Sequence, residues 1–198
     1  MSFKVKDHYY NKAKKENYLA RSVYKLEEIN NKYNILNKNM QVLDLGYYPG
    51  SWTQYASKVI LPGGKLVGID IQEVNKKIQT IENVTVFQKD INDVKSLSEL
   101  GVEEKFDALI SDMAPKTTGI KSVDQARSMQ LVEMVFYHLP NFLKSGGNFV
   151  IKVFDSHEAQ LYLKEQKSLF EQFNYLKPKS TRSVSKEFFA IGKGYKGE

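Results

Sequence analysis

The fold is decided by one stretch near the start of the chain, Gln41-Val-Leu-Asp-Leu-Gly-Tyr-Tyr-Pro-Gly50-Ser-Trp52. It opens with a short apolar run that ends at Gly46, which is the pattern of a buried strand over residues 41–46. A turn with two glycines follows, and Ser51 is a suitable N-cap for a helix that runs to Ile60. A buried strand, a glycine turn and a helix in this order predict one unit of a parallel sheet.

The same alternation continues on both sides of this unit. Apolar residues at steps of three and four predict a preceding helix over residues 18–33. Further strands are predicted at residues 65–71, 83–87, 106–112, 147–154, 175–177 and 187–191. Helices are predicted at residues 124–139, ending at Pro140, and at residues 157–173. Near-continuous apolar strands that alternate with helices predict an α/β fold with a doubly wound, mostly parallel sheet.

Composition and charge narrow the class of protein. The chain has 198 residues, a net charge of +6 and no cysteine. The length suits a single domain over residues 1–198, and the missing cysteine excludes disulfides, thiolate metal sites and cysteine nucleophiles. We expect no metal site. We also expect no membrane span, because no apolar run reaches the roughly 20 residues of a membrane helix. We therefore expect a cytoplasmic protein.

The charge is uneven along the chain. Residues 1–40 hold nine basic and four acidic residues, and residues 177–198 hold six and two, so the middle of the chain is mildly acidic. The first part includes a basic N-terminal arm of about residues 1–17. Such basic ends suit a polyanionic partner, although solvated, frayed ends would have the same composition.

Polar residues gather where the strands end, which is where ligands bind in such sheets. Asp70 is placed to accept hydrogen bonds from a ribose diol, and Asp90 lies where an adenine edge is expected. The fingerprint Gly-x-Gly-x-x-Gly is absent, which counts against NAD, and acidic residues suit a cofactor without phosphates, such as S-adenosylmethionine. The alternative is that these residues are ordinary turn glycines and helix caps. The candidate cofactor-binding residues are Asp44, Gly46, Tyr48, Pro49, Gly50, Trp52, Asp70, Ile71, Asp90, Ile91 and Asp112.

Two features favour oxygen as the acceptor of a methyl group. The segment Ser111-Asp-Met-Ala-Pro115 stands where base amino-methyltransferases usually have Asn-Pro-Pro-Tyr, a motif that holds the exocyclic amine. Carbon-5 methylation of pyrimidines normally needs a cysteine nucleophile, and the chain has no cysteine. Lys152 lies inside an otherwise apolar strand, where lysine is rare. It can take a proton from a hydroxyl or remain charged and stabilise an alkoxide, unless it only extends to water from the strand end.

Five motifs in the same order resemble the FtsJ/RrmJ family of RNA ribose 2′-O-methyltransferases. They are Arg21–Ile29, Asp44–Trp52, Ser111–Pro115, Phe149–Phe154 and Thr181–Glu187. The similarity runs from about residue 8 to residue 194. It implies a catalytic domain with a Rossmann-like fold that depends on S-adenosylmethionine, with a seven-stranded sheet whose last strand is antiparallel.

The resemblance also implies a catalytic tetrad, which falls on Lys25, Asp112, Lys152 and Glu187. In the family pattern Lys152 activates the 2′-hydroxyl and the other three residues position it and tune its charge. The chain departs from that pattern at Tyr47 and Tyr48, where Ala-Ala is common, and at Phe189, which is usually tyrosine. Because neither change touches the tetrad, we expect an active enzyme.

The basic ends then have a use in binding RNA. The candidate contacts are Lys4, Lys6, Lys12, Arg21, Arg182 and Lys186. Tyr9, Tyr10 and Tyr18 are placed to stack on bases or to pack against the sheet. We expect a monomer that methylates large-subunit ribosomal RNA in the assembled subunit. The alternatives are a transfer-RNA or mRNA-cap ribose methyltransferase, a non-catalytic RNA-binding assembly factor and a nucleotide-dependent oxidoreductase.

Overall fold

Seven strands form one sheet in the computed structural model, which describes residues 8–197. The strands are β1 (Gln41–Leu45), β2 (Lys65–Asp70), β3 (Val84–Gln88), β4 (Phe106–Ser111), β5 (Leu143–Phe154), β6 (Phe170–Leu176) and β7 (Glu187–Tyr195). Their order across the sheet is β3-β2-β1-β4-β5-β7-β6. Strands β1 to β5 pair in parallel, whereas β7 is antiparallel to both β5 and β6. The predicted doubly wound sheet with an antiparallel last strand is confirmed.

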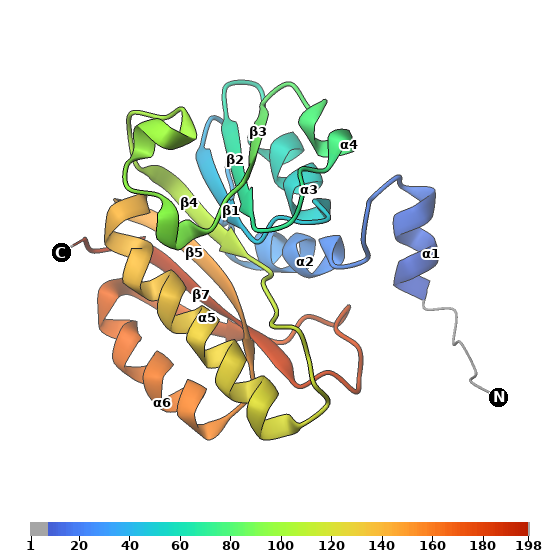
Figure 1. Ribbon diagram of the computed structural model, residues 1–198, viewed down its shortest axis with the longest axis vertical. Helices are drawn as coiled ribbons and strands as arrows, with labels where there is room; N and C mark the ends of the chain where they lie inside the picture. Colours follow the sequence, from blue (N-terminus) through green and yellow to red (C-terminus); the bar gives the residue numbers. More distant parts are fainter. Residues whose placement is uncertain (1–7, 198) are drawn as a thin grey trace.

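Helices cover both faces of this sheet (Figure 1). The helices are α1 (His8–Lys15), α2 (Val23–Tyr33), α3 (Ser51–Val59), α4 (Lys76–Gln79), α5 (Lys121–Phe142) and α6 (His157–Gln166), with short 3₁₀ helices at Ile91–Asp93 (η1), Leu97–Leu100 (η2) and Lys167–Leu169 (η3). Apolar side chains of α2, α3 and α4 pack on one face, and those of α5 and α6 pack on the other. Within residues 8–197, no helix combines the length and apolarity needed to cross a bilayer.

Helix α1 was not predicted as ordered structure. Ala13 of α1 packs with Val23 and Tyr24 of α2, and Tyr9 and Tyr18 lie against this small cluster. These two tyrosines therefore pack within the protein. Lys4 and Lys6, two of the predicted RNA contacts, lie outside the described residues.

Several predicted helix boundaries are wrong, including the start of α5, which lies at Lys121 and not at residue 124. The helix predicted over residues 18–33 begins at Val23, because the chain turns after Asn17, which has a positive φ of 62°. Helix α5 continues past Pro140 to Phe142. A proline removes only its own N–H, and the amide of Leu143 still bonds to Leu139 and closes the last turn.

The helix predicted over residues 157–173 ends at Gln166, and residues 170–176 form β6 instead of the short strand predicted at 175–177. Phe170 and Phe173 fit a helical spacing, but pairing with β7 overrides that local pattern. Phe170 lies over Gly192 of β7, where an added Cβ would come within 2.5 Å of its ring. The bare backbone of Gly192 thus makes room for the aromatic ring that holds the edge strand.

Candidate active site

The alternation of side chains along the strands places the charged candidates on one face. Asp44, Asp70, Asp112 and Lys152 lie at the carboxyl ends of β1, β2, β4 and β5. Each follows, by two or four residues, an apolar side chain that packs beneath α2 and α3; these are Val42, Leu66, Ile110 and Val150. Because residues two apart in a strand share a face, the four charged side chains gather under these helices at one edge of the sheet.

Lys152 of β5 is held by Asp112, which lies at the end of the neighbouring strand β4. Its side chain is only 8% exposed, and its Nζ lies 3.1 Å from Oδ1 of Asp112. The amine also donates a hydrogen bond to the backbone carbonyl of Asp112. Lys152 therefore does not extend into open water. Oδ1 of Asp112 receives no directed hydrogen bond from the described residues, so it keeps accepting capacity inside the site.

A second ion pair joins α2 to β7. Nζ of Lys25 donates to Oε1 of Glu187, and both side chains are largely buried. The ring of Phe189 lies beneath this pair, with its centroid 5.8 Å from Nζ of Lys25 and 5.6 Å from the ring of Trp52. Phe189 thus supports the pair by packing, which a tyrosine ring would also provide.

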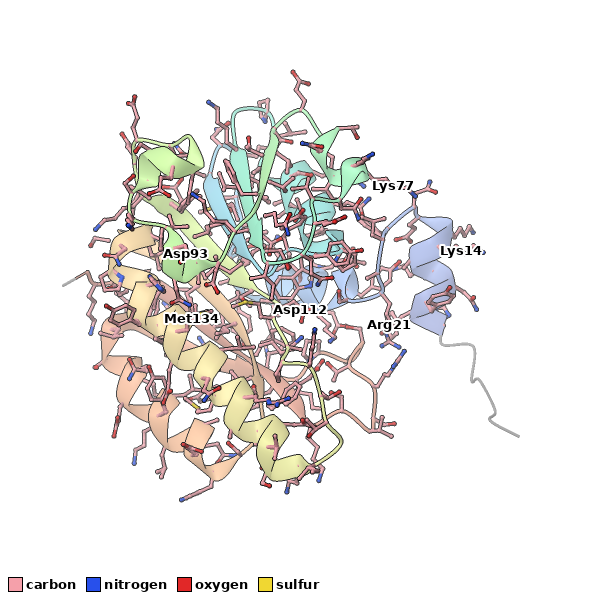
Figure 2. All side chains as sticks on the ribbon, in the orientation of Figure 1. Lys14, Arg21, Lys77, Asp93, Asp112 and Met134 are labelled. Carbon is pink, nitrogen blue, oxygen red and sulfur yellow. The ribbon has the colours of Figure 1, made fainter. Side chains whose placement is uncertain are left out.

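The two pairs form a single cluster. In the antiparallel register Phe189 lies opposite Lys152, and Glu187 is two residues from Phe189, so its side chain is on the same face as Lys152. Burial raises the pKa of the Glu187 carboxyl, but the charges of Lys25 and Lys152 act against burial, and the resulting pKa lies below the usual value. The structure therefore brings the four residues of the predicted tetrad together. Figure 2 shows Asp112 near the centre of the molecule, where β4 ends.

A basic pocket of about 370 Å³ lies beside the Lys25–Glu187 pair. Its lining residues are Arg21, Ser22, Lys25, Arg182, Val184, Ser185 and Glu187. Burial lowers the pKa of Arg21, and the nearby charge of Arg182 lowers it further. Two guanidinium groups brought together beside an ion pair form a site suited to the phosphates of a polyanion.

Arg21 and the segment at residues 177–186 are tied to each other and to α2. Arg21 donates to the carbonyl of Ser180, and its Cζ lies 5.4 Å from the ring centroid of Tyr9. Glu28 of α2 accepts hydrogen bonds of 2.7 and 2.8 Å from the amides of Lys179 and Ser180. The segment that carries Arg182 into the pocket is therefore fixed by the side chain of Glu28 on α2 and by that of Arg21, which precedes α2.

The cofactor candidates on β1 and β2 are also positioned. Oδ2 of Asp70 accepts the amide of Tyr48 at 3.0 Å, and Oδ1 accepts the amide of Gln72 at 2.9 Å. Asp44 accepts a 2.7 Å hydrogen bond from Thr53 of α3. Complete burial raises the pKa of Asp44 to about 7, while the Thr53 hydrogen bond opposes this rise.

The turn after β1 has no room for side chains at its glycines. Gly46 has a φ of +70°, and an added Cβ would lie 2.0 Å from Cγ of Met113. Gly50 has a φ of +113°, and an added Cβ there would clash with the side chain of Ile78. Both positions have a backbone conformation that glycine adopts without strain. Because Gly46 has no side chain, the turn can also lie close to Met113 at the end of β4.

Residues Tyr47 and Tyr48 of this turn have different surroundings. Tyr47 is buried in the core below α3, where its hydroxyl accepts the amide of Asn75 and its ring covers Gly68. Tyr48 is partly exposed beside Asp70 and precedes Pro49 through a cis peptide bond. The bulky pair therefore contributes one core ring and one surface ring.

The remaining cofactor candidates divide between surface and core. Ile71 is 69% exposed next to Asp70, which leaves an apolar surface at the end of β2. Asp90 is exposed and caps η1, as its alternative assignment proposed. Ile91 and Trp52 are buried, and Nε1 of Trp52 donates to the carbonyl of Ser22 at 2.9 Å.

The predicted RNA contacts lie in different settings. Arg21 and Arg182 share the basic pocket, and Lys186 is exposed just before Glu187. Nζ of Lys12 on α1 lies 3.9 Å from Oε1 of Glu16 and 4.2 Å from the ring centroid of Tyr24. The pocket thus includes two of the predicted contacts directly, whereas Lys12 packs against the N-terminal helices.

Several residues of the site were not predicted. Ser22, Val184 and Ser185 line the pocket, and Glu28 anchors the segment beside it. Their positions within two family-like motifs were the available signal for the pocket residues. Glu28 also lies within the motif Arg21–Ile29, but nothing local distinguished it, because a glutamate on an amphipathic helix is most often a solvated side chain.

A family model described as FtsJ-like methyltransferase matches residues 18–195, nearly the whole of the described chain. The chain belongs to the FtsJ-like methyltransferase family. This agrees with the family that the five motifs resemble, and it shows that the protein is a methyltransferase.

Curated relatives of this FtsJ-like methyltransferase match over almost their full length. Two proteins named ribosomal RNA large subunit methyltransferase E are 44% and 45% identical; they come from Bdellovibrio bacteriovorus and Syntrophobacter fumaroxidans. The alignments cover 97% of this chain in both cases, and 98% and 97% of those proteins. A crystal structure described as a ribosomal RNA methyltransferase from Plasmodium falciparum superimposes with a TM-score of 0.77 at 28% identity, covering 91% of this chain and 100% of that one.

Proposed function

We propose that this FtsJ-like methyltransferase transfers a methyl group from S-adenosylmethionine to the ribose 2′-hydroxyl of one nucleotide in large-subunit ribosomal RNA. The observation that carries the proposal is the cluster of Lys25, Asp112, Lys152 and Glu187 beside the basic pocket. The names of the curated relatives support ribosomal RNA as the substrate.

The residues at the ends of β1, β2 and β4 fit S-adenosylmethionine. Asp44, Asp70 and Asp112 are carboxyl groups, which suit ribose hydroxyls and a cationic sulfonium better than phosphate. Asp112 keeps an accepting oxygen, and Ile71 offers an apolar surface next to Asp70. The bound donor would supply an electrophilic methyl group. Asp70 would hold the ribose diol, and Ile71 would contact the adenine.

Lys152 is placed to act on the acceptor hydroxyl. In its neutral form Nζ can take the hydroxyl proton, and as an ammonium group it stabilises the alkoxide that forms. Asp112 holds the amine in place through its carboxylate and its carbonyl. Lys25 and Glu187, which line the basic pocket, orient the ribose, while Arg21 and Arg182 in the same pocket bind the adjoining phosphates.

Methyl transfer from a tritium-labelled donor tests this function. Assembled large subunits, free ribosomal RNA and transfer RNA are offered in parallel, all from a strain that lacks the corresponding methylation. We expect label on large subunits, at one nucleotide whose 3′ phosphodiester bond resists alkaline cleavage, because 2′-O-methylation blocks that reaction. Label only on transfer RNA, or at an alkali-sensitive site on a base, would contradict the proposal.

We also infer that the enzyme acts as a monomer in the cytoplasm. The tetrad and the basic pocket are built from residues of one chain, which supports a monomer. The bacterial relatives named for ribosomal RNA support the location, because bacterial ribosomes are assembled in the cytoplasm. Light scattering of the purified protein under assay conditions tests the oligomeric state, and a stable dimer would contradict it.

A further inference from the structure

A series of side-chain contacts connects the end of β3 to the buried side of α5. Asp90 follows β3 and caps η1, and its Oδ1 accepts both the backbone amide and the Nδ2 group of Asn92, each at 2.9 Å. No hydrogen bond from the described residues engages its other oxygen, Oδ2, and the residue is exposed. One carboxylate oxygen is therefore used within the protein, and the other is available to a ligand.

Asn92 is held from its other side by α5. Nε2 of His138 lies 3.0 Å from Oδ1 of Asn92, and Sδ of Met134 lies 3.4 Å from its Nδ2. Figure 2 shows Met134 on α5 close to Asp93 of η1. These contacts orient the side-chain amide, with its oxygen toward the histidine and its nitrogen toward Asp90.

His138 is suited to holding that amide in one orientation. It is only 6% exposed, packs against the ring of Phe142, and its Nδ1 has no hydrogen-bond partner among the described residues. Burial lowers the pKa of the ring, while the charge of Asp90 acts in the opposite direction. A neutral ring with its proton on Nε2 donates to the asparagine oxygen, so this network selects that tautomer.

We propose that His138 is a positioning residue that acts through Asn92 to aim the free oxygen of Asp90 at the exocyclic amine of the cofactor's adenine. The inference rests on the proposed function, in which Ile71 contacts the adenine, and on the expectation from the sequence that the adenine edge lies beside Asp90. A carboxylate oxygen accepts a hydrogen bond from an amine, whereas a carbonyl in the same position repels it. His138 therefore contributes to discrimination between adenine and hypoxanthine without touching either base.

Calorimetric binding of two ligands to the full chain without RNA tests this role. The ligands are S-adenosylhomocysteine and its inosine counterpart, in which a carbonyl replaces the amine. We expect the wild-type protein to prefer the adenosyl ligand. His138→Phe should lower that preference about 10-fold, as loss of one hydrogen bond to a charged group implies. His138→Gln, whose amide nitrogen can donate to Asn92, should keep most of the preference.

Two further variants separate positioning from stability. Asn92→Ser changes an exposed residue of η1 and should lower the preference as His138→Phe does, even if the histidine variant fails to fold. His157→Phe, at an exposed histidine that begins α6, is the matched control and should keep the wild-type preference. At saturating donor, the methyl-transfer kcat of folded Asn92→Ser should equal that of wild type while KM for the donor rises.

The outcomes distinguish the inference from the function on which it rests. A wild-type protein that binds neither ligand would remove the proposed cofactor site and this inference with it. If the wild type prefers the adenosyl ligand and Asn92→Ser keeps that preference in full, the positioning role is wrong and the cofactor site stands.

Discussion

Single side chains decide the chemistry of this site, and Lys152 shows how. A strand interior is an unfavourable place for lysine, yet the amine finds both a carboxylate and a carbonyl at Asp112. The same alternation that buries Val150 beneath α2 directs Lys152 to that face two residues later. Its position follows from strand geometry, and its partners keep the buried charge balanced.

Lys152→Ala should reduce methyl transfer by at least about 10³-fold, because it removes the group that acts on the acceptor hydroxyl. Binding of S-adenosylhomocysteine, measured by calorimetry, should stay within a few-fold of wild type. Lys164→Ala, at an exposed lysine of α6, is the control and should leave activity unchanged. Full activity of the Lys152 variant on the native substrate would rule out this role.

Asp44 links the site to stability through pH. Burial raises its pKa from 3.8 to about 7. The folded protein therefore keeps this proton up to about pH 7, while the unfolded chain releases it near pH 3.8. Between these values the folded state binds more protons, so the free energy of unfolding falls as the pH rises.

Asp44→Asn cannot ionise and should escape this loss. We expect its melting temperature, relative to wild type, to increase from about pH 5 to about pH 8 when both are measured without cofactor. Thr53 can still donate to the amide oxygen, so the packing around α3 is preserved. A difference in melting temperature that is independent of pH would contradict the raised pKa.

Among the elements, α2 has the largest share in assembling the site. It carries Lys25 toward β7 and Glu28 toward the segment at residues 177–186. Leu26 and Ile29 of the same helix pack into the core. One amphipathic helix thus fixes a member of the tetrad and the wall of the basic pocket at the same time.

Glu28→Ala should loosen that wall, because two backbone amides lose their acceptor. We expect KM for RNA to rise several-fold with a smaller change in KM for the methyl donor. Steady-state kinetics with each substrate varied in turn measures this separation. Glu27→Ala on the same helix is the control, and an equal effect there would show that charge alone is responsible.

The elements show where sequence patterns suffice. Strands β1, β2 and β4 were predicted to within one residue, because their apolar runs are bounded by glycine or charged residues. Residues 167–173 were assigned to a helix, since nothing local distinguishes Phe170 in a helix from Phe170 on an edge strand. Its partner on β7, Tyr195, lies 25 residues away and decides the outcome.

At the scale of the whole molecule, the charges divide into an acidic and a basic region of one site. The carboxyl groups lie at the ends of β1, β2 and β4, and the guanidinium groups line the pocket between α2 and the segment before β7. Under the proposed function, the basic region would bind the substrate RNA and the acidic region would bind the methyl donor. Binding of the two should respond differently to salt, because only RNA releases condensed counterions.

Affinity for RNA should fall steeply as salt rises, whereas affinity for S-adenosylhomocysteine should change little. Arg182→Gln should reduce the slope of log affinity against log salt by about one unit, as expected for one lost phosphate contact. Lys164→Gln on α6, which covers the opposite face, should leave the slope unchanged. Fluorescence anisotropy over a salt series measures both slopes, and equal slopes for Arg182→Gln and wild type would exclude this contact.

The site as a whole was predictable only in part. Strand ends identified Asp44, Asp70, Asp112 and Lys152 from local patterns. Lys25 and Glu187 lie 162 residues apart, and only a family resemblance connected them before the structure brought them into contact. Contacts between distant residues that share no local pattern depend on how the whole chain folds. One example is the hydrogen bond from the backbone amide of Lys179 to the carboxylate of Glu28.

The position of β7 has a consequence for how the protein is made. It inserts between β5 and β6, and it is the neighbour that binds β6 to the sheet. A nascent chain that has emerged from the ribosome as far as β6 holds α2 and Lys152 but lacks Glu187. We therefore expect catalytic competence to arrive with the strand translated after all the others, so that an unfinished polypeptide would not methylate the RNA of the ribosome that is synthesising it.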